Sequence, residues 1–67
     1  MSVARVTKIT AASSKGFDDA VRAGLERAGR TIRGITGLHV VEQKCSVKDG
    51  HIDEWRVTME VTFILEG

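Results

Sequence analysis

The sequence has little of what usually stabilises a very small domain. It contains 67 residues and a single cysteine, Cys45, so no disulfide can form within the chain. Cys45 and the two histidines, His39 and His51, are too few ligands for a four-coordinate structural zinc site. A chain of this length buries only a small core, and assembly with other copies is the remaining support. We therefore expect one domain over residues 1–67 that works as a homo-oligomer.

The chain also lacks a strong charge of either sign and any long hydrophobic run. Its formal net charge is +1, which argues against a nucleic-acid partner held by a large basic field. No stretch approaches the length of a membrane span, and no apolar segment follows a basic one near the N-terminus. We expect neither a nucleic-acid nor a membrane partner, and the free thiol favours a cytoplasmic location. The hydrophobic fraction of 42% excludes a disordered chain.

The first half of the sequence changes from a strand pattern to a helical one. β-Branched residues dominate residues 1–10, which predicts a strand. Ser13 or Ser14 is expected to cap the following helix by accepting a hydrogen bond from a free backbone N–H. Over residues 16–33 the apolar spacing predicts an amphipathic helix, with Gly34 as its C-terminal stop. The apolar stripe of this helix comprises Phe17, Ala20, Val21, Gly24, Leu25, Ala28 and Ile32.

The second half predicts a long antiparallel hairpin. Residues 38–48 form the next expected strand, and Asp49-Gly50 is typical of a type I′ turn, in which both central residues have positive φ. From Trp55 onward apolar and polar side chains alternate, which predicts a strand with one face against the helix. This strand can extend over about fourteen residues, or nearly 50 Å at ~3.4 Å per residue. The predicted fold is α+β: a βαββ subunit whose three-stranded antiparallel sheet wraps one helix.

Two side chains of these strands raise the question of catalysis. Strict alternation puts His39 on the same strand face as Gly37, Val41, Gln43 and Cys45. His39 and Cys45 would then be roughly 20 Å apart, too far for a nucleophile and its base. Trp55 belongs to the inward-facing set, which predicts packing in the core. No catalytic residue and no enzymatic activity are predicted.

The order and spacing of these elements resemble the dodecin family along the whole chain. The motifs are a serine-rich turn before an alanine-rich helix, the run Val40-Val41-Glu42-Gln43, and the run from Trp55 to Phe63. Each motif is weak alone, but their order, spacing and total length are together specific. The resemblance implies a homo-dodecamer of tetrahedral symmetry. It also implies that oxidised flavin, FMN or riboflavin, is stored between the subunits as stacked pairs.

The positions that bind flavin in that family differ in this sequence. Gly37 stands where flavin-binding dodecins have a tryptophan that stacks on the isoalloxazine ring. Arg56 stands where they have a glutamine that hydrogen-bonds the ring, and Glu42 falls at an often acidic position near the ribityl chain. Glycine has no aromatic face, so a stacking contact worth about 1 kcal/mol is missing. The resemblance implies Gly37, Glu42 and Arg56 as the cofactor-binding residues.

Ligands other than flavin remain open. Some bacterial relatives bind coenzyme A, and a flavin-free branch is associated with calcium. The resemblance therefore also permits a flavin-free shell that binds calcium or coenzyme A, or that is purely structural. The carboxylates show no spacing typical of a calcium loop, so no metal-ligating residue is predicted. The polar face of the third strand is either solvated or turned towards a ligand or another subunit.

Overall fold

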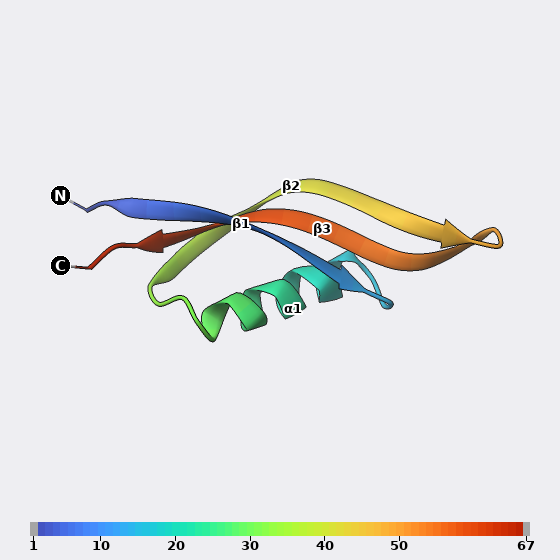
Figure 1. The fold of residues 1–67 in the computed structure, drawn as a ribbon, viewed down its shortest axis with the longest axis horizontal. Coiled ribbons are helices and arrows are strands. Elements are labelled where there is room, and N and C mark those ends of the chain that lie inside the picture. The colour runs from blue at the N-terminus through green and yellow to red at the C-terminus, as the bar shows by residue number, and fades with distance from the viewer. Residues whose placement is uncertain (1, 67) are drawn as a thin grey trace.

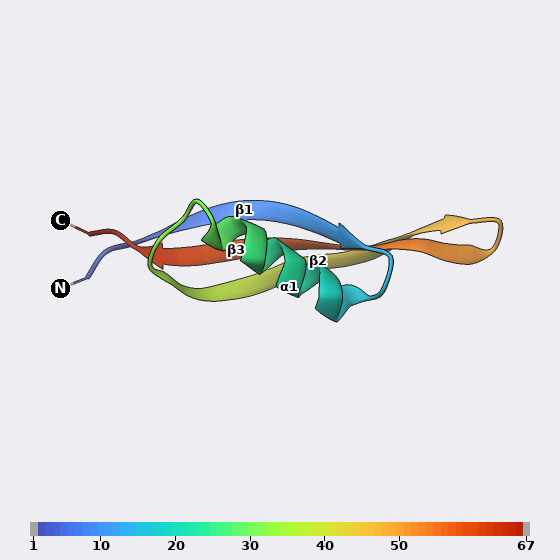
Figure 2. The same cartoon turned by 90° about the horizontal axis from the view of Figure 1, so that it is seen from below.

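The computed structural model describes residues 2–66 and contains four elements in the order strand, helix, strand, strand. These are β1 (Ala4–Ser13), α1 (Phe17–Gly29), β2 (Ile35–Lys48) and β3 (His51–Ile64). The strands form one sheet in the order β1-β3-β2, and β3 is antiparallel to both neighbours. α1 lies along one face of this sheet, under β1 and β3 (Figures 1 and 2). The predicted βαββ fold is confirmed.

β3 is the centre of the sheet and sets the length of the molecule. It has 14 residues, as its alternating pattern predicted. β1 continues past residue 10 to Ser13, because Ala11, Ala12 and Ser13 pair with β3 despite their weak strand propensity. β2 likewise begins at Ile35, before the predicted start, through its pairing with Phe63. Ladder pairing with β3 therefore decides where both outer strands begin and end.

The β1–α1 connection differs from the expected serine cap. The N-cap residue is Gly16, and no side chain caps the helix. The buried Ser13 hydroxyl instead donates to Asp19 Oδ2 at 2.6 Å and accepts the Lys15 backbone N–H at 2.9 Å. The prediction that Ser13 or Ser14 caps the helix is wrong, because Ser13 is still part of β1 and fixes the turn from there.

The C-terminal end of α1 also differs from the predicted stop at Gly34. The helix ends at Gly29, well before Gly34. Gly34 has φ 76° and lies next to the start of β2, where its carbonyl accepts the Ile64 N–H at 3.0 Å. A Cβ at this position would lie 3.2 Å from the Ile64 carbonyl oxygen, so glycine suits both the backbone angle and the close approach. Gly34 therefore belongs to the entry into β2 and is not the helix stop.

The core lies between α1 and the centre of the sheet. Ala20, Val57 and Met59 form its fully buried cluster, and Met59 is 0% exposed. Gly24 lets the helix approach closely, since a Cβ there would lie 2.5 Å from Met59 Cε and 3.0 Å from Ala11 Cβ. The predicted stripe faces the sheet except for Leu25, which is 38% exposed. Partly buried side chains surround the cluster: Ile9, Ala11, Phe17, Val21, Leu38 and Val40.

The β2–β3 hairpin extends beyond the rest of the molecule (Figure 1). Asp49 and Gly50 have φ 52° and φ 79°, which confirms the predicted turn with two positive φ angles. β1 pairs with β3 only as far as Trp55, so the hairpin tip is a two-stranded ribbon. Val47 and Ile52 are exposed near this tip. The result is an elongated subunit of 51 × 20 × 13 Å.

Candidate functional site on the uncovered sheet face

One face of the sheet is covered by α1, and the opposite face has no helix over it in residues 2–66 (Figure 1). Val57, Met59 and Val61 are buried towards α1, so the alternate residues of β3 point away from it. Cross-strand partners share a face, and the pairing register therefore assigns the residues of β1 and β2 as well. We call this the uncovered face. It comprises Val6, Lys8, Thr10 and Ala12 of β1, Gly37, His39, Glu42, Lys44 and Ser46 of β2, and Glu54, Arg56, Thr58, Glu60, Thr62 and Ile64 of β3.

A register shift within β2 changes which residues reach this face. Val40 pairs with Met59 and Glu42 with Thr58, so Val41 has no partner in the ladder. One extra residue reverses the alternation beyond it. Gln43 and Cys45 consequently lie on the helix-covered side, opposite Val57 and Trp55. The expectation that His39 shares a face with Val41, Gln43 and Cys45 is wrong, because it assumed an unbroken strand.

The three candidate cofactor-binding residues all lie on the uncovered face. Gly37 pairs with Thr62, Glu42 with Thr58, and Arg56 with Lys44. Glu42 and Arg56 are therefore near neighbours on adjacent strands. Gly37 is remote from them, since Thr62 and Arg56 are six residues, or about 20 Å, apart along β3. The structure brings two of the three candidates together and leaves the third at the other end of the face.

The Glu42–Arg56 end of the face is a cluster of alternating charges. Arg56 donates from Nε and Nη2 to Glu54 Oε1, at 2.9 and 2.8 Å. Lys44 Nζ lies 3.3 Å from Glu42 Oε1. Arg56 and Lys44 are direct cross-strand partners, and each of these like charges is offset by its own carboxylate. Ion pairs as exposed as these are worth about 0–1 kcal/mol, so a bound ligand can replace them at small cost.

The Gly37 end of the face is open and carries a histidine. A Cβ built at Gly37 would meet nothing within 4 Å. His39 lies two residues further along the same strand and face, and its Nδ1 is 3.5 Å from Glu60 Oε1. The sequence suggests His39 only as a zinc ligand or as a partner for Cys45. Its predicted position on the same strand face as Gly37 is confirmed.

The large aromatic side chains lie elsewhere. Trp55 pairs with Ser13 and Cys45 on the helix-covered side, which confirms its predicted inward orientation. It is half-buried and lies outside the cluster around Met59, so the prediction that Trp55 packs in the core is wrong: the hairpin carries it past the end of the helix-covered core. Phe63 is on the same side of β3, and Phe17 is in α1. No tryptophan or phenylalanine of residues 2–66 is therefore available to stack on a ligand at the uncovered face.

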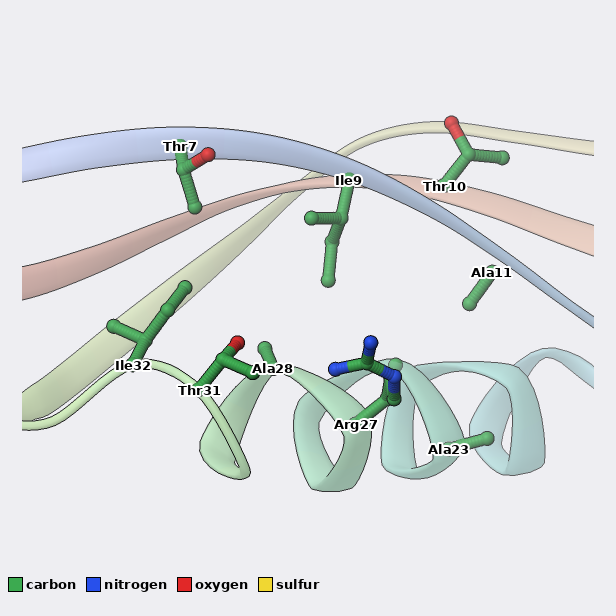
Figure 3. Close-up of a pocket in the computed structure, with 10 residues that line it drawn as sticks. Thr7, Ile9, Thr10, Ala11, Ala23, Arg27, Ala28, Thr31 and Ile32 are labelled. Atoms are coloured by element: carbon green, nitrogen blue, oxygen red, sulfur yellow. The ribbon is translucent and has the colours of Figure 1, made fainter.

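A groove lies on the other side of the sheet, between β1 and α1 (Figure 3). Its volume is about 440 Å³, and Ile9, Ala11 and Ile32 provide much of its apolar lining. The Arg27 guanidinium extends from the helix towards β1 across this groove (Figure 3). None of the three candidate residues lines it. The groove is thus separate from the uncovered face.

Within residues 2–66, His, Cys, Asp and Glu side chains nowhere gather in a group of three or more that could hold a metal ion. In the same residues, no helix is both long enough and apolar enough to cross a membrane.

Comparison with known proteins gives consistent matches over nearly the whole chain. The dodecin family model matches residues 3–66. A curated dodecin from Thermus thermophilus is 30% identical over 64 residues, which is 96% of this chain and 93% of the relative. The dodecin structure from Streptomyces davaonensis gives a TM-score of 0.94 at 39% identity, covering 98% of this chain and 97% of that one. A calcium dodecin from Mycobacterium tuberculosis, described as calcium-chelating with a novel calcium-binding site, gives 0.83 at 28% identity, covering 96% and 91%.

Proposed function

Because this chain belongs to the dodecin family, we propose that it forms a homo-dodecamer that sequesters a flavin, FMN or riboflavin, between its subunits. The main support is the uncovered face, on which Gly37, Glu42 and Arg56 all lie. A chain of 67 residues with a small core and one side of its sheet left open gains stability by placing that side against another copy. The proposed role is storage, without catalysis, in the cytoplasm, where a free thiol persists.

The spacing of the candidate residues supports a site shared by two subunits. Gly37 and Arg56 are about 20 Å apart along the strand direction, so one ring system cannot contact both within a subunit. Two copies that face each other in antiparallel fashion bring Gly37 of one copy near Glu42 and Arg56 of the other. A ligand held between them then contacts all three residue types.

Each residue has a distinct proposed role. Gly37 leaves an open, flat stretch of backbone on which a planar ring can lie. The guanidinium of Arg56 donates hydrogen bonds to a ring carbonyl or to the phosphate of FMN. The Glu42 carboxylate accepts hydrogen bonds from ribityl hydroxyls. Both charged groups are held by exposed ion pairs that exchange at small cost.

Titration of riboflavin and FMN into the purified protein tests this proposal. Bound flavin is expected to lose fluorescence saturably, with a fixed number of flavins per subunit. Light scattering is expected to give a mass near twelve times the 7.3 kDa of one chain. A monomeric mass at micromolar concentration, or no quenching by the wild type at high micromolar concentration, would overturn it.

A flavin-free shell that binds calcium is the second candidate. Two observations favour it: large aromatic side chains are missing from the uncovered face within residues 2–66, and the similar protein from M. tuberculosis is described as calcium-chelating. Calcium takes about 6–8 oxygen ligands, more than one described subunit gathers, so it would bind where copies meet. Coenzyme A is a further ligand of this shell, with its phosphates on basic side chains. A chelator is expected to lower the melting temperature of a calcium-loaded shell and to leave a flavin store unchanged.

A further inference from the structure

We infer that His39 provides the stacking surface for the flavin ring in this chain, at the end of the uncovered face where Gly37 has no side chain to offer. The inference rests on the proposed function, because it concerns how the same site holds its ligand. Three observations carry it: the pairing of β2, the exposure of the imidazole and its contact with Glu60, and the open space at Gly37.

The pairing of β2 isolates the segment 37–40 from the rest of the strand. These four residues pair in regular register with Thr62 to Met59, and a register shift interrupts the ladder on each side, at Ile35/Gly37 and at Val40/Glu42. Bulges re-aim side chains and are common beside functional sites. Between the two shifts the strand alternates regularly. Leu38 and Val40 pack against the core, and Gly37 and His39 both face away from it.

The His39 imidazole is held at its edge and exposed elsewhere. Its side chain is 74% exposed, which leaves room for a ligand against the ring. Nδ1 lies 3.5 Å from Glu60 Oε1 on β3, its direct cross-strand partner. The contact places the edge of the imidazole towards β3. An oriented and accessible ring is what a stacking contact needs, because less side-chain freedom is then lost on binding.

Gly37 gives a planar ligand access to this imidazole. Gly37 and His39 lie on one face, about 7 Å apart along the strand. A side chain at Gly37 would project into the space between the ligand and the sheet, whereas glycine leaves nothing within 4 Å of the Cβ position. A ring that lies over Gly37 therefore reaches His39. Histidine is among the side chains that stack on nitrogen heterocycles such as nucleic-acid bases.

Substitution of His39 tests the inference through flavin fluorescence quenching by the assembled protein. His39→Ala is expected to raise the riboflavin Kd about tenfold, the change that corresponds to 1.4 kcal/mol. His39→Phe keeps an aromatic face and is expected to stay within about threefold of wild type, as stacking predicts. His51→Ala, which removes the other histidine at the hairpin, is the matched control and is expected to bind as the wild type does. Light scattering and circular dichroism confirm that each variant is folded and assembled.

The outcomes separate this inference from the proposed function. If wild type and His39→Ala bind riboflavin equally well, or if His39→Phe loses as much affinity as His39→Ala, the stacking role is overturned and flavin storage stands. If the wild type does not bind riboflavin, flavin storage by this chain is itself overturned. Binding by Gly37→Trp alone would then show only that the uncovered face accepts a ring once an indole is added.

Discussion

His39 and Cys45 lie on opposite faces of β2, with the unpaired residue Val41 between them. His39 is exposed beside Glu60, whereas Cys45 is half-buried opposite Trp55 on the helix-covered side. A ligand on the uncovered face therefore does not contact the thiol.

Replacement of Cys45 by alanine is expected to leave the riboflavin Kd within about twofold of wild type, because the side chain is on the far side of the sheet. The melting temperature is expected to fall by a few degrees at most, since a small half-buried group is removed. Quenching titrations and thermal unfolding measure the two quantities. A large loss of affinity would contradict the assignment of Cys45 to the helix-covered side.

Gly37→Trp is expected to tighten flavin binding by about tenfold or more: its indole takes the place of His39 against the ring and offers a larger aromatic surface, where a side chain meets nothing within 4 Å. Gly29→Trp is the matched control, since Gly29 is at the end of α1 and also has no atom near its Cβ position. The control is expected to leave the affinity unchanged. Equal affinity of Gly37→Trp and wild type would indicate that Arg56 or the shape of the site excludes the ring.

Arg56→Ala is expected to change the free energy of unfolding by less than ~1 kcal/mol, because its ion pair with Glu54 is exposed. Its effect on ligand binding is expected to be larger, about fivefold or more in Kd, through the loss of a charge-assisted hydrogen bond. Arg30→Ala breaks an exposed ion pair with Glu26 on α1 and is the control for a generic change in charge. Equal affinities of the two variants would remove Arg56 from the site.

Gly24→Val is expected to destabilise the fold by about 1–3 kcal/mol through overpacking against Met59 and Ala11. Gly29→Ala is the control: it adds a methyl group in open space and is expected to be neutral or stabilising by up to ~1 kcal/mol. Urea unfolding monitored by the fluorescence of Trp55 compares both with wild type. A Gly24 variant as stable as wild type would mean that the helix can shift away from the sheet without cost.

The features that the sequence predicts well are those set by neighbouring residues. The hairpin turn at Asp49-Gly50 and the alternation from Trp55 onward need only local rules, and the structure confirms both. The face assignment after Val40 was wrong because the extra residue in β2 is set by pairing with β3, which local alternation does not reveal. The serine cap failed for a similar reason, since pairing with β3 keeps Ser13 in the first strand.

For the candidate site, too, the sequence indicates individual residues but not the pairing that positions them. Gly37, Glu42 and Arg56 came from a family resemblance, and the structure puts all three on one face. The separation of about 20 Å between Gly37 and Arg56 depends on the pairing register and on strand length, which no motif states. The contact between His39 and Glu60 also joins residues far apart in the sequence. The sequence therefore supplies the candidates, but it does not show where they lie relative to one another.

The strand order β1-β3-β2 leaves both outer strands with one unpaired edge within the described residues. Free edges of this kind template the addition of further strands, and repeated addition produces fibres. An assembly with closed point-group symmetry ends that growth after a fixed number of copies, whereas a head-to-tail contact does not. We expect the solubility of this protein to depend on whether its assembly closes after a fixed number of copies. Variants that assemble without closing should precipitate instead of accumulating as stable monomers.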